Sequence, residues 1–266
     1  MDIIKELILA LILSSLLAGL AAVQKALTPK ALFLAWSCSM IITFCGGAVS
    51  FAILAATFVY TVLAGKIGKS RRAVEKKVNA KTGKRDSTQI FCNVGMGTIL
   101  LLLSCLLEKP MLKLAYAAVM AASLADSLAS ELGILSKADP VDICTLKKTQ
   151  RGLSGGVTLW GFCASLIGAL LIAGVYAIGT PNWKHILFIT ACGFAGALLD
   201  SILGSCLQVK YRCPVCKMVT ERKEHCGQET VRVKGYPKIT NDMVNLTCNV
   251  FVGVLAVILL LIGGKL

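Results

Sequence analysis

Long apolar runs separated by short polar segments extend along the whole chain. An α-helix needs about 20 apolar residues to cross a bilayer. The candidate spans are 3–22, 31–45, 48–65, 88–107, 111–135, 153–179, 184–208 and 243–264. The second run is short and meets the third at Gly46-Gly47, where a re-entrant or half helix is the alternative. The pattern therefore predicts an all-α polytopic membrane protein with seven or eight transmembrane helices.

The composition agrees with this prediction. The chain is 56% hydrophobic and 16% charged, with a mean hydropathy of +0.76, whereas a soluble domain is about 45–50% apolar and about 25% charged. Residues 1–266 are interpreted as a single membrane domain that contains a cysteine-bearing loop at 209–242. The first apolar run lacks the positive start of a cleaved signal, so we expect it to be retained as a helix.

Basic residues are distributed unevenly between the two sides. Four segments, at 23–30, 66–87, 136–152 and 209–242, contain 23 of the 28 lysines and arginines. With eight spans these segments share one side, and the positive-inside rule makes that side cytoplasmic with both termini opposite. A re-entrant second segment would move the N-terminus to the cytoplasmic side. The polybasic loop at 66–87 is interpreted as a topogenic, lipid-contacting loop.

The net charge of +14 indicates an anionic partner, such as lipid headgroups, a phosphorylated substrate or a nucleotide. Nucleic acid is disfavoured, because the basic loops contain almost no aromatic residues on which bases could stack. The expected partners are therefore the bilayer and a phosphorylated ligand.

Asp126 and Asp200 interrupt two of the apolar runs. Placing a carboxylate in the bilayer centre costs about 2.5–3.5 kcal/mol on insertion scales, so an intramembrane acid indicates a functional site. The local sequences are alike, Ala125-Asp126-Ser127-Leu128 against Leu199-Asp200-Ser201-Ile202, which suggests a weak internal duplication. A buried ion pair and a proton or ion relay in a transporter are the alternatives.

Helical spacing brings further polar residues to the same end of the spans. Asp242, Asn245 and Asn249 share one face, and Gln89 and Asn93 follow Arg85 at the start of another helix. Glu131 lies nearer the membrane surface. Asn249 and Gln89 are equally compatible with simple interhelical hydrogen bonding. Two faces carry the acids among small residues: Ser123, Asp126, Ser130 and Gly133, and Gly193, Gly196, Ala197, Asp200 and Gly204.

A basic, glycine-rich turn leads into the run that starts at residue 153. It contains Lys147, Lys148, Arg151, Gly152, Gly155 and Gly156. Exposed backbone N–H groups at a helix N-terminus, with cations nearby, would bind an anion. Asp126, Asp200 and Asp242 offer the oxygen ligands that Mg²⁺ prefers. Together these features predict phosphoryl or nucleotidyl transfer to a lipid-soluble acceptor.

The loop at 209–242 contains a Cys213-Pro214-Val215-Cys216 motif, followed by His225-Cys226. This spacing is compatible with a closed, structural zinc site, and a reducing compartment favours a metal over a disulfide. Adjacent residues need not both reach one ion, so His225 is the least certain ligand. Redox-active or inert thiols are the alternative.

Five motifs resemble, in order, those of the integral membrane family that includes transmembrane protein 19 and plant phytyl-phosphate kinase. The motifs are Gly83-Lys84-Arg85-Asp86-Ser87-Thr88-Gln89 with Asn93 and Gly95, Ala125-Asp126-Ser127-Leu128-Ala129-Ser130-Glu131-Leu132-Gly133, Arg151-Gly152-Leu153-Ser154-Gly155-Gly156-Val157-Thr158, Asp200-Ser201-Ile202-Leu203-Gly204 with Gln208, and Asn241-Asp242 with Val244-Asn245. Leu153 stands where a threonine or asparagine would be expected.

The resemblance implies a prenyl- or phytyl-phosphate kinase that uses a nucleoside triphosphate at the cytoplasmic leaflet. A looser similarity to dolichol kinases and lipid cytidylyltransferases favours CTP over ATP. In this interpretation Asp126, Asp200 and Asp242 bind Mg²⁺ with support from Glu131, while the residues that contact phosphate are Arg85, Asn93, Lys147, Lys148, Arg151, Gly152, Gly155, Gly156, Asn241 and Asn245. A transporter or flippase for an anionic lipid or metabolite, and a non-catalytic structural protein, are the alternatives.

Overall fold

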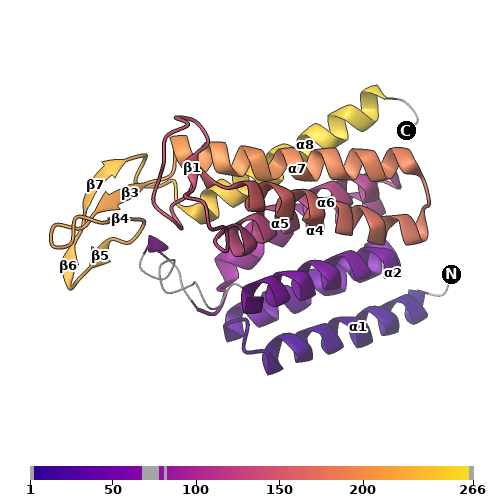
Figure 1. The fold of residues 1–266 in the computed structure, drawn as a ribbon. Helices are drawn as coiled ribbons and strands as arrows, with labels where there is room; N and C mark the ends of the chain where they lie inside the picture. Colours follow the sequence, from indigo (N-terminus) through magenta and orange to yellow (C-terminus); the bar gives the residue numbers. More distant parts are fainter. Residues whose placement is uncertain (1–2, 68–77, 81–82, 264–266) are drawn as a thin grey trace.

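The computed structural model describes residues 3–67, 78–80 and 83–263, and these residues include seven long helices arranged as one bundle (Figure 1). The helices are α1 (Ile3–Val23), α2 (Pro29–Ile67), α4 (Ser87–Leu106), α5 (Met111–Gly133), α6 (Leu159–Gly179), α7 (Trp183–Cys206) and α8 (Asn241–Ile262). All seven are long and apolar enough to cross a membrane, which confirms the predicted fold class. Most of the polybasic loop lies outside the described residues, so its lipid contact stays a prediction.

Helix α2 consists of two antiparallel arms joined at Gly47, whose φ of 78° is readily adopted only by glycine. Leu32 and Trp36 of the first arm line the same cavity as Phe58 and Thr61 of the second. A straight helix would hold Leu32 and Thr61 about 44 Å apart. Each arm is about 27–30 Å long, close to the thickness of the hydrocarbon core. The fold therefore supports eight membrane-crossing segments over a re-entrant second one.

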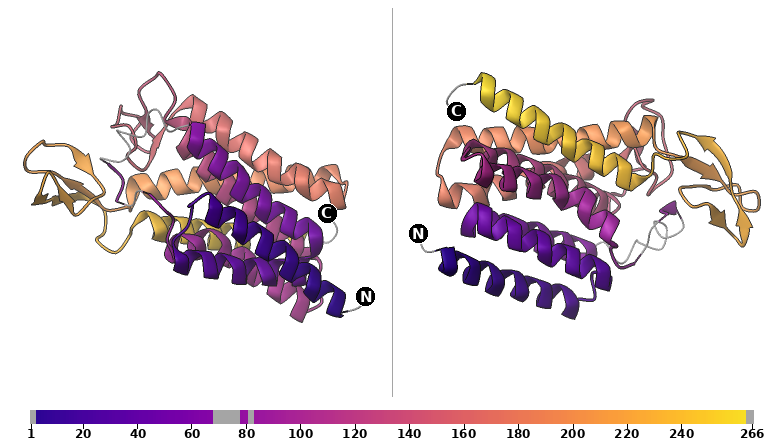
Figure 2. Two further views of the ribbon diagram at one scale, coloured as in Figure 1. Left: turned by 90° about the horizontal axis from the view of Figure 1, so that it is seen from below. Right: turned by 180° about the vertical axis from the view of Figure 1, so that it is seen from behind.

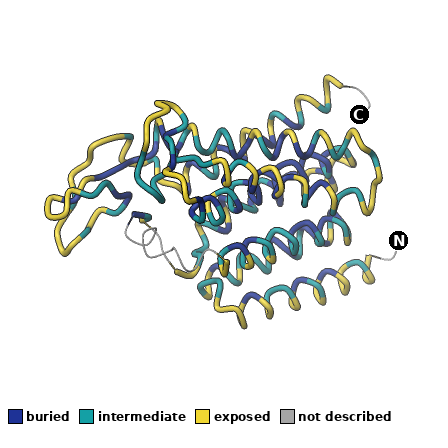
Figure 3. The backbone as a smooth tube through the Cα atoms, in the orientation of Figure 1, coloured by how far each residue is buried: buried dark blue, intermediate teal, exposed yellow. Residues whose placement is uncertain are grey.

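Helix α5 is the centre of the bundle and packs against α2, α4, α6, α7 and α8. Its segment 114–125 is completely buried and consists largely of alanines. These small side chains let several helices approach one axis closely. In contrast, α1 exposes apolar side chains along most of its length (Figure 3), as expected of a surface that faces lipid.

The connections before α2, α4, α6 and α8 gather at one end of the bundle, and both termini lie at the other (Figures 1 and 2). We call the former the loop end. Three small antiparallel sheets form there. The strands are β1 (Val141–Asp142) with β2 (Gly156–Val157), β3 (Lys210–Arg212) between β4 (Val219–Thr220) and β7 (Val231–Lys234), and β5 (Glu224–His225) with β6 (Gln228–Glu229). That the loop end faces the cytoplasm stays a prediction.

Helix α6 begins at Leu159, six residues later than the hydrophobic pattern predicts. Gly152 and Gly155 have φ angles of 79° and 83°, which are incompatible with a helix. The next residues form β2, and Thr158 caps α6 by accepting a hydrogen bond from the Gly161 N–H at 3.1 Å. The prediction that the glycine-rich turn opens directly into a helix N-terminus is therefore wrong.

Candidate carboxylate site at the loop end

Asp126 of α5 and Asp200 of α7 lie close enough for their charges to interact. The two helices pack tightly because small residues meet along their contact. A Cβ added at Gly196 would lie 2.6 Å from the Cβ of Ala122, and one added at Gly193 would lie 2.7 Å from the Cβ of Ala121. The predicted small-residue face of α7 thus lies against α5, and this approach brings the two acids together.

The polar face of α8 reaches the same place. The side-chain amide nitrogen of Asn245 donates to Asp200 Oδ2 at 2.8 Å and to the carbonyl oxygen of Asn241 at 3.3 Å. Asp242 is buried in the first turn of the helix. Asn245 therefore contacts Asp200 from a third helix.

Other amides near the acids hold the helices together. Asn249 donates to the Cys92 carbonyl at 2.8 Å and accepts from the Ser123 hydroxyl at 3.2 Å. Gln89 forms a reciprocal capping box with Asp86 at the start of α4, and Asn93 donates to the Gln89 carbonyl at 2.9 Å. These contacts favour the structural interpretation of Asn249 and Gln89.

Arg85 is the basic residue whose charge acts on Asp126. Its backbone is fixed to the α1–α2 connection: the Arg85 N–H donates to the Ala26 carbonyl at 2.9 Å, and its own carbonyl accepts from the Thr28 N–H at 3.0 Å. This pairing holds the guanidinium at the loop end of the bundle. Arg85 therefore lies near enough to Asp126 for their charges to interact, and its role toward a ligand stays a prediction.

A cavity of about 80 Å³ extends from Arg85 into the bundle between α1, α2, α4 and α5. Its lining surface is largely apolar, although serine and threonine residues line it together with Arg85, Gln89 and Asn93. The small-residue face of α7 offers no such space, because it is filled by contacts with α5, α6 and α8. The available space therefore lies beside α1 and α2, where Ser123 and Ser127 of α5 line the cavity.

The glycine-rich turn packs against α7 one helical turn beyond Asp200. A Cβ at Gly204 would lie 3.3 Å from the Gly155 nitrogen, and one at Gly155 would lie 2.5 Å from the Ser205 Cα. Any side chain at Gly155 would therefore collide with the backbone of α7. The turn is held beside the acid pair, although it is not part of a helix N-terminus.

Glu221 is a member of the site that sequence reasoning missed. Its carboxylate accepts hydrogen bonds from both the N–H and the hydroxyl of Ser154 in the glycine-rich turn, and its charge acts on Asp200. Burial raises the pKa of Glu221, while the bonds from Ser154 and nearby Lys210 oppose that shift. The predicted anion-binding turn therefore holds an internal carboxylate.

Lys210 is buried beside this contact, and its Nζ donates to the Ser154 carbonyl at 2.7 Å. Burial and the neighbouring Lys234 lower the pKa of Lys210. No motif marks Lys210 or Glu221, because each belongs to the site only through the fold of the 209–240 segment. A clue was available only in the position of Glu221 among basic residues.

The predicted basic residues occupy two different settings. Arg151 donates to the carbonyls of Ile134, Ser136, Lys137 and Ala138 at 2.5 to 3.4 Å, so its guanidinium holds the segment after α5. Lys147 and Lys148 are exposed, and Lys148 pairs with Asp139 at 3.2 Å. Glu131 is half-buried near the end of α5. Their roles toward a ligand stay predictions.

Asp142 organises the loop before the turn, and the sequence analysis did not identify it. Its carboxylate accepts from the Cys144 and Thr145 N–H groups, from the Thr145 hydroxyl and from the Ser205 hydroxyl, at 2.8 to 3.1 Å. Burial alone would raise the pKa of Asp142, but these bonds outweigh it and hold the pKa below its usual value. The Ser205 contact ties the loop to α7.

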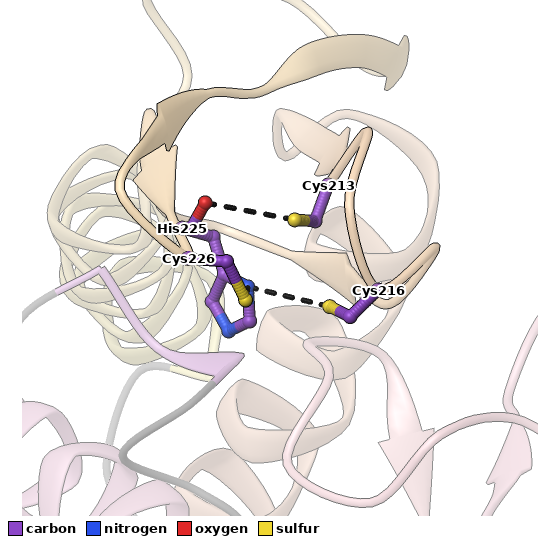
Figure 4. A group of neighbouring side chains, drawn as sticks. All are labelled: Cys213, Cys216, His225 and Cys226. Atoms are coloured by element: carbon purple, nitrogen blue, oxygen red, sulfur yellow. Dashed lines mark hydrogen bonds between the residues drawn. The ribbon is translucent and has the colours of Figure 1, made fainter.

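The predicted cysteine motif and His225-Cys226 do come together, in the segment that leads to α8 (Figure 4). Although burial opposes it, backbone N–H groups of Cys216 and Val215, together with His225, lower the pKa of the Cys213 thiol to about 6. Burial and the neighbouring thiols raise the pKa of Cys226 to about 11. The two cysteines thus belong to one cluster of thiols beside His225.

The fold and site define a multi-pass integral membrane protein with a carboxylate cluster at one end of its bundle. A family model described as Integral membrane protein DUF92 matches residues 12–253, and the chain belongs to this family. This confirms the family membership predicted from the motifs.

Two relatives cover most of the chain. Protein PGR of Arabidopsis thaliana is 28% identical over 90% of this chain and 91% of its own length. An uncharacterized membrane protein of Synechocystis sp. is 30% identical, over 76% of this chain and 81% of its own length. No solved structure matches the chain significantly.

Proposed function

We propose that this protein is a prenyl- or phytyl-phosphate kinase, which transfers a phosphoryl group from a nucleoside triphosphate to an isoprenoid monophosphate at the cytoplasmic leaflet. One observation carries the proposal: the largely apolar cavity ends at Arg85 and Asn93, and the Arg85 charge acts on Asp126 of the acid pair. An apolar chain with an anionic head matches such a site, since the chain enters the cavity while the head meets the guanidinium.

The acid pair supports a role for Mg²⁺ in this proposal. Mg²⁺ is usually held by one or two carboxylates together with substrate phosphates, and Asp126 and Asp200 supply two neighbouring carboxylates. Asp242, on the helix that contacts Asp200, remains a third candidate. Bound Mg²⁺ would neutralise charge on the transferring phosphoryl group.

The reaction requires little covalent chemistry from the protein. An oxygen of the acceptor monophosphate forms a new bond to the terminal phosphorus of the donor, the bond to the nucleoside diphosphate breaks, and a lipid diphosphate results. The acceptor is already anionic at neutral pH, so no general base is needed. The task of Arg85, Asn93, Asn245 and the turn around Gly155 is to orient two anions.

The cavity of about 80 Å³ accommodates only part of a lipid chain, because a cavity of about 150 Å³ holds a single benzene molecule. Helix α1 packs chiefly against α2 and is exposed along most of its length. A small displacement of α1 would therefore enlarge the cavity without disturbing the core around α5. This gives an isoprenoid chain a route from the bilayer.

The first test measures lipid diphosphate formed by purified protein in detergent with Mg²⁺, using phytyl, geranylgeranyl and farnesyl monophosphates with CTP and ATP. We expect Asp126→Asn and Asp200→Asn each to lower kcat/KM by at least about 100-fold, since a metal ligand stabilises the transition state by several kcal/mol. Glu108→Gln, a matched change in an exposed residue of the α4–α5 connection at the other end, should leave kcat/KM unchanged.

Normal turnover by the Asp126→Asn, Asp200→Asn double variant would end the proposal. If folded protein gives no product with any pair, sealed vesicles test the transporter alternative. Movement of an anionic lipid without nucleotide consumption would favour a flippase, a reading that the intramembrane acids also permit.

A further inference from the structure

We propose that Cys213, Cys216, His225 and Cys226 bind one zinc ion, and that this ion folds the segment which holds the glycine-rich turn in place. One candidate ligand atom from each residue lies within 4.8 Å of all the others. Four ligands around a tetrahedral zinc, with Zn–S bonds of about 2.3 Å, lie about 3.8 Å apart. The observed cluster is therefore only slightly wider than a loaded site.

The first pair of ligands comes from a tight turn. The Lys217 N–H donates to the Cys213 carbonyl at 3.0 Å, and the Cys213 N–H donates to the Met218 carbonyl at 3.0 Å. Lys217 has a φ of 62°, a conformation that costs energy for a residue with a side chain. This strained turn directs the Cys213 and Cys216 thiols toward one point (Figure 4).

The second pair comes from the β5–β6 hairpin. His225 pairs with Gln228, so Cys226 and Gly227 form a two-residue loop, and their φ angles of 53° and 75° match a type I′ turn. Glycine or asparagine is preferred at the position of Cys226, so a cysteine there has a cost that ligation would offset. The turn brings Cys226 Sγ to 3.2 Å from His225 Nδ1.

The sequence alone left open whether the adjacent residues His225 and Cys226 could both reach one ion, and the geometry allows it. Nδ1 of His225 lies 3.5 Å from Cys216 Sγ as well as 3.2 Å from Cys226 Sγ, so neighbouring residues do converge on one site. Three thiols and one imidazole are soft donors in a closed arrangement. That donor set favours structural zinc over Mg²⁺ or Ca²⁺, which prefer oxygen ligands.

The segment needs such an ion because it has little core of its own. Its strands are two to four residues long, and β6 and β7 are exposed throughout. Val231 and Val233 face outward, 63% and 45% exposed. Segments of this size generally require a disulfide or a metal to fold, and all twelve cysteines of the chain are free thiols.

The zinc-folded segment contacts the carboxylate site directly. Glu221 and Lys210 both form hydrogen bonds with Ser154. In addition, the Gln150 amide donates to the Val219 carbonyl at 2.9 Å. Residues 210–221 include β3 and β4, which flank the Cys213–Cys216 turn. Zinc is thus a positioning element for the turn, and this inference holds whatever reaction the carboxylate site performs.

Metal analysis of the full-length protein in detergent tests the proposal. We expect one zinc per chain in wild type, and less than a tenth of that in Cys213→Ser, Cys216→Ser and Cys226→Ser. Cys163→Ser, at an exposed position on α6, should keep the full complement. His225→Ala should lose zinc, whereas His185→Ala, at the only other histidine, should not.

A second pair of measurements separates ligation from misfolding. His225→Cys should retain zinc, because a fourth thiolate replaces the imidazole. Cobalt-substituted wild type should show thiolate-to-cobalt charge-transfer absorption that strengthens in His225→Cys. The proposal is overturned if folded wild type contains no zinc and takes up none, if iron is bound instead, or if mass spectrometry finds a disulfide within the cluster.

Discussion

Single residues at the loop end have their roles set by hydrogen-bond partners more than by residue type. Arg151 is of a residue type that often binds phosphate, but its guanidinium donates to four backbone carbonyls. Glu221 lies in an unremarkable loop sequence, yet it contacts Ser154 and acts on Asp200. Buried polar groups need partners, and here those partners come from distant parts of the chain.

Asp142 gives a prediction at this scale. Asp142→Asn should lower the stability by about 1–2 kcal/mol at neutral pH, because charge-assisted hydrogen bonds to three residues are weakened. Thermal unfolding in detergent would show a drop of a few degrees. A Ser205→Ala change should reproduce part of the loss, since it removes one of those bonds.

The pH dependence of this effect has a definite sign. The folded-state pKa of Asp142 is lowered, so its contribution is present above the unfolded value of about 3.9 and is lost as the pH falls through the folded value. The gap in Tm between wild type and Asp142→Asn should be constant from pH 7 to about 5 and shrink below about 4. A gap that widens in acid would contradict this account.

Among the elements, α5 and α7 decide the geometry of the acids. Their axes approach because alanines on one helix meet glycines on the other. A Cβ added at Gly196 would collide with the Cβ of Ala122 and with Val252. Neither side chain is flexible enough to move out of the way. The separation of Asp126 and Asp200 is therefore fixed by two backbones.

Gly196→Val tests this packing. Overpacking of a tight contact costs about 1–3 kcal/mol, so we expect a lower Tm in detergent together with loss of any Asp200-dependent activity. Gly174→Val is the matched control, because nothing lies within 4 Å of a Cβ at Gly174. Equal Tm values for the two variants would show that α5 and α7 tolerate separation.

For the whole molecule, the seven long helices of the described residues, with α2 divided into two arms, leave both ends of the chain opposite the loop end (Figure 1). The distribution of basic residues predicts that the loop end faces the cytoplasm. Exposed lysines lie at both ends: Lys147 at the loop end, and at the opposite end Lys109 in the α4–α5 connection and Lys184 in the first turn of α7.

Labelling of sealed vesicles with a membrane-impermeant amine reagent tests the orientation. In inverted vesicles, mass spectrometry should find Lys147 modified and Lys109 and Lys184 protected, because the positive-inside rule puts the basic loops in the cytoplasm. Vesicles of the opposite orientation should give the reverse pattern. If Lys184 is modified in inverted vesicles and protected in vesicles of the opposite orientation, the proposed topology is wrong.

The sequence by itself determined the helices, the reversal point at Gly46-Gly47, the small-residue face of α7 and the family. These follow from local properties: the length of an apolar run, helical spacing and glycine's access to positive φ. It also placed Asp126, Asp200, Asn245 and Arg85 at a common depth, because direction and distance along a helix fix depth.

Only the tertiary structure decided which distant segments of the chain are in contact. The Glu221–Ser154 contact joins residues 67 positions apart, and the late start of α6 depends on the pairing of β1 with β2. The apolar cavity lies beside α1 and α2 because close packing fills the small-residue face of α7. Such contacts depend on how whole elements pack, which no local pattern of residues encodes.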